Sequence, residues 1–136
     1  LFRELNISSF VPSNILPHPR ENNVSPIKSF FSLGCGRIFD GTYEQMFNSL
    51  NLIKNFSKDT LIYFGHEYTL QNSKFCIHHD TKNRMLKNKI LEISEKLKNN
   101  LSTTPTNLKD ELDCNIFLRC HDLNSFSKLR ELKDNF

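Results

Sequence analysis

The order of apolar and polar side chains predicts two strands joined by a helix in the first half of the chain. Residues 29–33 and 60–64 are short apolar runs that carry aromatic or β-branched side chains, which is typical of buried strands. Between them, residues 43–55 carry apolar side chains at helical spacing, and Thr42 with Gln45 forms the capping-box pattern that begins a helix. This order predicts a right-handed crossover into a parallel or mixed sheet.

The second half has the apolar spacing of a helical region. Residues 70–78 are predicted to form a short helix with Thr69 as its N-cap, and a longer helix is predicted to begin at Asp80 or Thr81. The longer helix presents a shared apolar face made of Leu86, Ile90, Ile93 and Leu97. A final helix ending near Lys133 is predicted from the helical spacing of Leu123, Phe126, Leu129 and Leu132.

Other segments lack a regular pattern. Residues 1–28 combine several prolines with Asn and Ser, a composition that opposes both a helix and a central strand, so we expect an irregular lead-in. The "GCGR" sequence of residues 34–37 predicts a turn, and residues 101–121, around Pro105, predict an irregular connection. Because the chain opens with Leu1 rather than Met, we expect its natural start to lie upstream.

Composition narrows the class of protein. A chain of 136 residues with 38% hydrophobic side chains and 12 Phe is long enough for one domain, or one domain with a helical appendage. The net charge is only +3, and its basic residues are interspersed with acidic ones, which argues against binding to nucleic acid. No apolar run approaches the ~18 residues of a membrane span, so we expect a soluble, cytoplasmic protein without membrane contact.

The chemically reactive side chains give few patterns that are specific by themselves. The four cysteines form neither a C-x-x-C pair nor a zinc-ribbon spacing, so we expect reduced and mostly buried thiols. Gly65, His66, Glu67 and Tyr68 follow directly on an apolar strand, where α/β proteins often bind ligands. From spacing alone, His66 is either a ligand or a packed histidine. Glu67 is either a partner of His66 or a favourable anion in the first turn of the next helix.

Five stretches in this order resemble hydroxyacylglutathione hydrolase, or glyoxalase II, a family of the metallo-β-lactamase-fold superfamily. They are "FSLGCGRIFDGTYEQM" at 31–46, "TLIYFGHEYTLQN" at 60–72, "TTPTNL" at 103–108, "NIFLR" at 115–119 and "LRELKDNF" at 129–136. The resemblance implies an α/β fold that is helix-rich overall. Residues 29–80 would form the C-terminal half of a metallo-β-lactamase-like αββα sandwich, and residues 81–136 a small helical substrate-binding region. Residues 1–28 show no family motif.

The resemblance also implies a chemistry. Members hydrolyse S-D-lactoylglutathione to D-lactate and glutathione in methylglyoxal detoxification, using a two-metal site that is usually zinc, with iron or manganese as alternatives. Two such cations polarise the thioester carbonyl and lower the pKa of bound water from ~15.7 to about 7. On the matching positions His66 is a metal ligand. The family positions that contact the glutathione part of the thioester are Arg37, Tyr68, Arg130 and Lys133, of which the last two pair with its glycine carboxylate.

The other metal ligands of the family have no counterpart here. The chain lacks the H-x-H-x-D-H run, the context of His18 does not fit a ligand, and Lys28 occupies the position of the bridging aspartate. One imidazole beside an ammonium does not hold two dications. We therefore expect a truncated or split hydrolase that is inactive alone and pairs with a separate N-terminal half-chain or with itself. The alternatives are a glutathione-conjugate binding module and a non-functional remnant of a disrupted reading frame.

Overall fold

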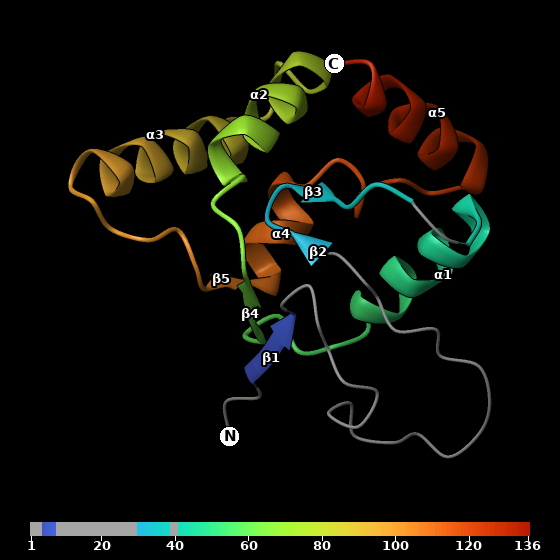
Figure 1. Cartoon of the computed structure of the whole chain (residues 1–136), viewed down its shortest axis with the longest axis horizontal. Coiled ribbons are helices and arrows are strands. Elements are labelled where there is room, and N and C mark those ends of the chain that lie inside the picture. The colour runs from blue at the N-terminus through green and yellow to red at the C-terminus, as the bar shows by residue number, and fades with distance from the viewer. Residues whose placement is uncertain (1–3, 8–29, 39–40) are drawn as a thin grey trace.

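The computed structural model describes residues 4–7, 30–38 and 41–136, and these residues form mostly helices (Figure 1). The helices are α1 (Tyr43–Ile53), α2 (Thr69–His79), α3 (Arg84–Lys98), α4 (Leu108–Cys114) and α5 (Leu123–Asp134). The strands are β1 (Glu4–Ile7), β2 (Phe30–Phe31), β3 (Gly34–Cys35), β4 (Leu61–Phe64) and β5 (Thr106–Asn107). The predicted helix-rich character is therefore confirmed. No helix in the described ranges is both long and apolar enough to cross a bilayer.

The strands form two separate groups. β4 lies in the middle of a three-stranded mixed sheet, parallel to β1 and antiparallel to β5. β2 and β3 pair only with each other among the described strands, as an antiparallel hairpin in which Phe31 lies opposite Gly34. The hairpin reverses at Ser32 and Leu33, and Leu33 has a φ of 57°. We call residues 30–35 the hairpin.

This topology corrects three predictions. The turn predicted for "GCGR" at residues 34–37 is wrong for Gly34 and Cys35, which form β3, because the chain reverses earlier, at Ser32 and Leu33. The strand at residues 60–64 is confirmed by β4, but its expected crossover to residues 29–33 is wrong, because the chain turns back on itself after Phe31. The parallel partner of β4 is instead β1, inside the segment 1–28 that we predicted to be irregular. That prediction is wrong for residues 4–7, and residues 1–3 and 8–28 lie outside the described residues.

The beginnings of the helices show which predicted caps form. The capping box of α1 is confirmed, because the Thr42 hydroxyl accepts from the Gln45 N–H (3.1 Å) and the Gln45 side chain accepts from the Thr42 N–H (2.9 Å). Such a cap contributes about 0.5–2 kcal/mol. Thr69 is not the cap of α2 but its first residue, and its hydroxyl pairs with that of Thr103 at 2.8 Å. The final helix is confirmed by α5, which Asp122 caps by accepting from the Ser125 N–H at 2.8 Å.

Two further helix predictions need correction. The N-cap of α3 is Asn83, which accepts from the Leu86 N–H at 3.0 Å, rather than Asp80 or Thr81. Asp80 is instead the C-cap of α2, and its carboxylate pairs with Arg119 and accepts from the Asn83 side chain. The expected irregular connection at 101–121 contains β5 and α4, and Asn107 caps α4 by accepting from the Asp110 N–H at 2.7 Å.

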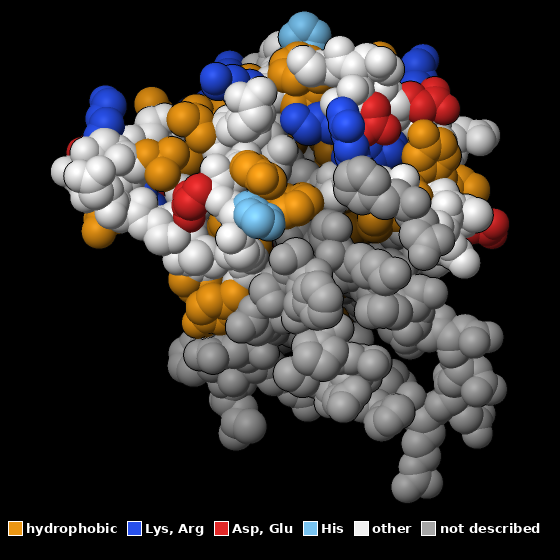
Figure 2. All heavy atoms as spheres, in the orientation of Figure 1, with side chains coloured by type: hydrophobic (Ala, Val, Ile, Leu, Met, Phe, Trp, Pro, Cys, Tyr) orange, Lys and Arg blue, Asp and Glu red, His pale blue; other side chains and the backbone are white. Residues whose placement is uncertain are grey.

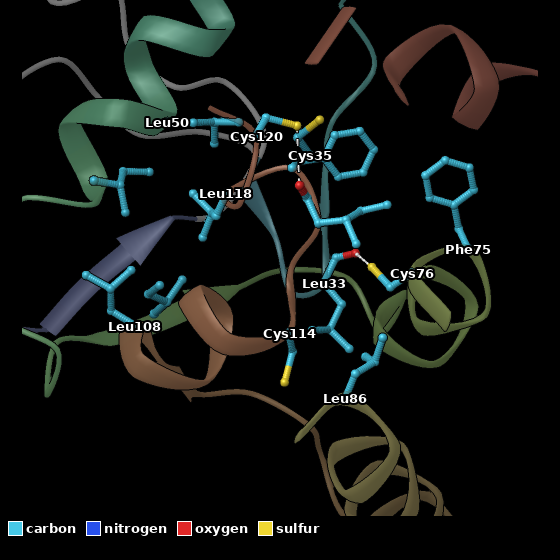
Figure 3. Close-up of a cluster of buried hydrophobic side chains, with 14 of the residues drawn as sticks. Leu33, Cys35, Leu50, Phe75, Cys76, Leu86, Leu108, Cys114, Leu118 and Cys120 are labelled. Carbon is cyan, nitrogen blue, oxygen red and sulfur yellow. Dashed lines mark hydrogen bonds between the residues drawn. The ribbon is translucent and has the colours of Figure 1, made fainter. Parts of the chain in front are cut away.

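One hydrophobic core joins the hairpin to all five helices of the described region (Figure 3). Leu33, which is 1% exposed, lies in the close-up between Cys76 of α2, Cys114 of α4 and Leu86 of α3. Burying an aliphatic side chain of this size contributes about 1.5–3 kcal/mol. The turn of the hairpin is therefore part of the core rather than a surface loop.

All four cysteines are free and buried, which confirms the expected reduced thiols. The Cys76 thiol donates to the Leu33 carbonyl (3.0 Å) and the Cys120 thiol to the Ile116 carbonyl (3.3 Å). Burial raises the pKa of Cys35 and Cys120 to about 11 and that of Cys76 and Cys114 to about 12. The thiols are therefore held in their unreactive protonated form near neutral pH.

We expect none of the four thiols to react with an aromatic disulfide reagent in the folded chain near neutral pH. All four should react after addition of denaturant, because unfolding returns each thiol to water and to an ordinary pKa. The release of coloured thiolate measures both states, with free glutathione as the positive control. Fast modification of even one cysteine under native conditions would contradict this arrangement of the core.

Candidate functional site

Three aromatic rings come together where β4 ends and α2 begins. β4 ends at Phe64, and the side chains of His66 and Tyr68 are exposed on the short connection that follows. Their rings stack, with centroids 5.1 Å apart and planes inclined by 10°. Phe31 of the hairpin packs against both, at 6.1 Å from the His66 ring and 5.5 Å from the Tyr68 ring. We call Phe31, His66 and Tyr68 the aromatic group.

Glu67 ties this connection to the loop before β5. Its carboxylate accepts from the Ser102 hydroxyl (2.7 Å), the Thr103 N–H (3.0 Å) and the Thr103 hydroxyl (2.9 Å). Partial burial raises the pKa of Glu67, but these hydrogen bonds together outweigh it and hold the pKa below its usual value. Glu67 precedes the N-cap of α2, Tyr68, so it is not an anion within the first turn of that helix. The described contacts make it an anchor for the 102–103 backbone.

A second group gathers around the carboxylate of Asp134. Arg37, just beyond β3, places its Nε 3.3 Å from Asp134 Oδ1 and donates from Nη2 to the Asp134 carbonyl at 3.3 Å. Arg130 of α5 donates from its Nη2 to the same Oδ1 at 2.7 Å. Lys133 lies one turn along α5, with its Nζ 5.1 Å from the centroid of the Phe75 ring. We call Arg37, Arg130, Lys133 and Asp134 the basic cluster.

The three cations of the basic cluster differ in their access to solvent. The Arg37 side chain is 61% exposed, whereas that of Arg130 is 3% exposed. Arg130 donates from Nη1 to the Cys35 carbonyl at 2.6 Å and lies over the Phe117 ring, so its charge is satisfied mainly inside the protein. Lys133 is half-buried, and burial together with repulsion from Arg130 lowers its pKa. Arg37 and Lys133 are therefore the cations more accessible to a ligand.

The aromatic group and the basic cluster are linked by the chain itself. Phe31 lies on one arm of the hairpin, and Arg37 follows the other arm after two residues. Figure 2 shows a face of the molecule on which a histidine is bordered by hydrophobic side chains, with Lys, Arg and acidic side chains gathered nearby. The structure therefore brings His66 close to Tyr68, and it brings Arg37 and Arg130 to the same carboxylate. It joins the two groups through the hairpin.

Two members of these groups were missed in the sequence. Asp134 stands four residues after Arg130 on the predicted final helix, and this i, i+4 spacing is a signal for an ion pair. Phe31 was predicted only as part of a buried strand, and nothing in its spacing indicates contact with His66.

The described residues do not fit a two-metal centre by themselves. Within residues 4–7, 30–38 and 41–136 there is no group of three or more His, Cys, Asp or Glu side chains that would hold a metal ion. His66 contributes one imidazole. The described contacts of its ring are with the aromatic rings of Phe31 and Tyr68, not with a carboxylate. His18 and Lys28 lie outside the described residues. We therefore derive no chemical step through a metal from this chain alone.

Comparison with known proteins identifies the class to which this helix-rich region belongs. Residues 67–136 match the family described as hydroxyacylglutathione hydrolase C-terminus. This match covers half of the chain. The chain therefore belongs to the hydroxyacylglutathione hydrolase family, as its motifs suggested.

Three similar proteins named hydroxyacylglutathione hydrolase illustrate the relationship. That of Pelagibacter ubique (strain HTCC1062) is 55% identical over 131 residues, covering 93% of this chain and 55% of that protein. That of Prochlorococcus marinus (strain MIT 9312) is 45% identical over 117 residues, covering 83% of this chain and 48% of that protein. That of Erythrobacter litoralis (strain HTCC2594) is 36% identical over 145 residues, covering 97% of this chain and 58% of that protein.

These coverages have two consequences. The chain spans about half the length of the curated relatives that it matches. The matches to the Pelagibacter and Erythrobacter proteins cover 93% and 97% of this chain. The part that they leave unmatched is shorter than the segment 1–28. The similarity to these relatives therefore reaches into that segment, although the motifs alone indicated no counterpart there.

Proposed function

We propose that this chain supplies the glutathione-binding part of a hydroxyacylglutathione hydrolase, together with one imidazole of its metal site. The reaction is hydrolysis of S-D-lactoylglutathione to D-lactate and glutathione. The observation that carries the proposal is the pairing of Arg37 and Arg130 with one carboxylate, that of Asp134, in a chain that belongs to this family. Lys133 lies one turn from Arg130 on the same helix and adds a third cation. Three cations and one anion leave a net positive charge that attracts the carboxylates of glutathione.

The residues of the basic cluster and Tyr68 would have different roles in binding. Arg37 and Lys133 are accessible enough to meet a ligand carboxylate directly. At about 4 Å near a protein surface, opposite unit charges attract by about 4 kcal/mol before desolvation and competing ions are counted. Asp134 is such a competitor, because its carboxylate already holds Arg37 and Arg130. Tyr68, which is 50% exposed, offers a ring face and a hydroxyl to the peptide part of the ligand.

His66 is the proposed link to the metal site. Its ring stacks on Tyr68, so the ligand-binding side chain and the proposed metal ligand touch each other. Zinc, with iron or manganese as alternatives, would supply a polarised carbonyl and a hydroxide at neutral pH. The further donors would come from a region outside this chain, such as a separate N-terminal half. On this proposal the chain alone does not hydrolyse the thioester.

The division of the chain follows from the same proposal. We propose that residues 29–80, with β4 as the central strand of the mixed sheet, belong to the metallo-β-lactamase-like sandwich, and that residues 81–136 form the helical substrate-binding region. Within residues 1–28, β1 would belong to the same sandwich, because it pairs in parallel with β4. The hairpin does not follow a simple boundary at residue 80. It precedes that residue in the sequence, but its turn packs among α2, α3 and α4, of which α3 and α4 lie after it.

A glutathione-conjugate binding module without catalysis is the second candidate. It is favoured by one observation: the basic cluster and Tyr68 are present in the described residues, whereas a metal-binding group is not. The two candidates share the binding step and differ only in whether hydrolysis follows when the missing donors are supplied.

Calorimetric titration with glutathione tests the shared binding step. We expect the chain to bind glutathione, and we expect Arg37→Ala and Lys133→Ala each to weaken binding by about tenfold or more, since each removes a charge-assisted hydrogen bond. Lys128→Ala is the matched control, because it removes an exposed lysine from the same helix, α5, outside the basic cluster. Absence of heat at millimolar glutathione, or an equal loss with the control, would remove both candidates.

Hydrolysis separates the enzyme from the binding module. We expect the chain alone to leave S-D-lactoylglutathione intact. Joined to the part of the Pelagibacter ubique relative that precedes the matched region, it should gain metal-dependent hydrolysis that His66→Ala abolishes. Thioester absorbance measures the reaction. Turnover by the chain alone that is lost in His66→Ala would contradict the incomplete metal site, and a well-folded fusion that binds glutathione without hydrolysis would favour the binding module.

A further inference from the structure

Glu111 is a fully buried carboxylate that the proposed function does not use. It lies in α4 and is 0% exposed. Its Oε1 accepts from the Ser32 hydroxyl at 2.6 Å, and its Oε2 accepts from the Leu33 N–H at 2.9 Å. The Asn115 side chain also donates to Oε2, at 3.0 Å. Two of these donors belong to the turn of the hairpin, 79 and 78 residues away in sequence.

Burying a carboxylate in a protein core costs free energy. Charged side chains are almost never fully buried unless they are paired, because water solvates them far better than the core does. The described hydrogen-bond partners of Glu111 are all neutral donors, and burial raises its pKa while those donors oppose the rise. An apolar side chain at this position would avoid the cost but would leave the Leu33 N–H without its partner. The carboxylate therefore fixes the turn.

The rest of the hairpin backbone is held in the same way. Five consecutive carbonyls accept from side chains: Ser32 from Asn72 (3.1 Å), Leu33 from Cys76 (3.0 Å), Gly34 from Asn115 (3.0 Å), Cys35 from Arg130 (2.6 Å) and Gly36 from Arg130 (3.4 Å). A side chain at Gly34 would place its Cβ 2.8 Å from the Asn72 amide nitrogen, so glycine permits this approach of α2. The donors come from α2, the C-cap of α4, and α5.

We propose that Glu111 is a positioning residue for the candidate binding site. This inference rests on the proposed function, because the site is the one assigned there. By fixing Ser32 and Leu33, Glu111 sets Phe31 against His66 and Tyr68 on one arm of the hairpin. On the other arm it sets the backbone that leads to Arg37 and the basic cluster. Glu111 itself touches no ligand.

The test compares Glu111→Gln with a milder change and with a control. Gln keeps the volume of Glu and can keep an oxygen toward the Leu33 N–H and the Asn115 amide, but it then presents an N–H₂ group to the Ser32 hydroxyl, which has to accept instead of donate. Ser32→Ala removes one of the same hydrogen bonds and leaves Glu111 in place. Ile93→Val, at a core position of α3 that is 1% exposed, is the control for a general loss of stability. The chain offers two readouts: the glutathione dissociation constant, and the ring-proton chemical shifts of His66 and Tyr68.

We expect Glu111→Gln and Ser32→Ala to move the His66 and Tyr68 ring resonances and to raise the glutathione dissociation constant. The rise should be about two- to tenfold, the range that a net hydrogen bond is worth. Ile93→Val should leave both readouts unchanged although it lowers the denaturation midpoint. Ser32→Ala carries the test alone if Glu111→Gln does not fold.

Two results would overturn the inference. One is that Glu111→Gln folds and leaves the His66 and Tyr68 ring resonances unchanged. If Glu111→Gln does not fold, the same result for a folded Ser32→Ala counts instead. The other is an equal effect in Ile93→Val, which would reduce Glu111 to a contributor to stability. If the unmodified chain does not bind glutathione, the proposed function fails, but the ring resonances still decide whether Glu111 positions the aromatic group.

Discussion

Hydrogen bonds from helix side chains to the backbone of residues 32–36 are the constraint on which the rest of this structure depends. Each strand of the hairpin has only two residues, so its own ladder satisfies few of its N–H and C=O groups. Because the turn is buried, the remaining groups need partners inside the protein. Asn72, Cys76, Asn115 and Arg130 donate to the carbonyls, and Glu111 accepts from the Leu33 N–H. Without them, burying the hairpin would leave these backbone groups unpaired, at about 1–3 kcal/mol for each group.

The same constraint explains how the two groups of the candidate site are brought to one region. The aromatic group and the basic cluster come from segments that are far apart in sequence, and the hairpin contributes a residue to the first and leads directly into the second. Arg130 acts at this junction, since one guanidinium holds the Cys35 carbonyl and pairs with Asp134. Asp134 in turn keeps Arg37 close to Arg130 despite their like charges. The candidate site and the buried core therefore share residues, so a substitution at Arg130 would affect both.

Much of the secondary structure was predictable because its signals are local. The capping box of α1, the apolar run of β4 and the apolar spacing of α5 each lie within a few residues of the element that they specify. The hairpin was not predictable from the run at 29–33, because a continuous apolar stretch does not show where the chain reverses. Leu33 takes a positive φ without being glycine, which removes the usual sign of a turn. The short α4 was not predicted because its seven residues are too few to show the apolar spacing of a helix.

Most members of the candidate site were named from the family motifs, whereas the environments of their side chains were not predictable. His66 and Tyr68 are close in sequence, and the final helix carries Arg130 and Lys133 one turn apart. The sequence did not show that Arg130 is buried, since an arginine on an amphipathic helix usually faces solvent. Glu111 stands among Lys and Asp residues that indicate a solvated face, yet its partners lie 78 and 79 residues away. Such long-range hydrogen bonds depend on the packed structure and leave no local pattern.

Amide hydrogen exchange at Leu33 tests most directly whether the hairpin and the helical region form one cooperative unit. The Leu33 N–H is bonded to Glu111 Oε2, and the Asn115 N–H, at the end of α4, is bonded to the Glu111 carbonyl at 2.8 Å. If the hairpin is held as described, both amides exchange only when the whole unit unfolds, and their opening free energies agree. Exchange at Leu33 that is orders of magnitude faster than at Asn115 would show that the hairpin opens independently, and would contradict the account.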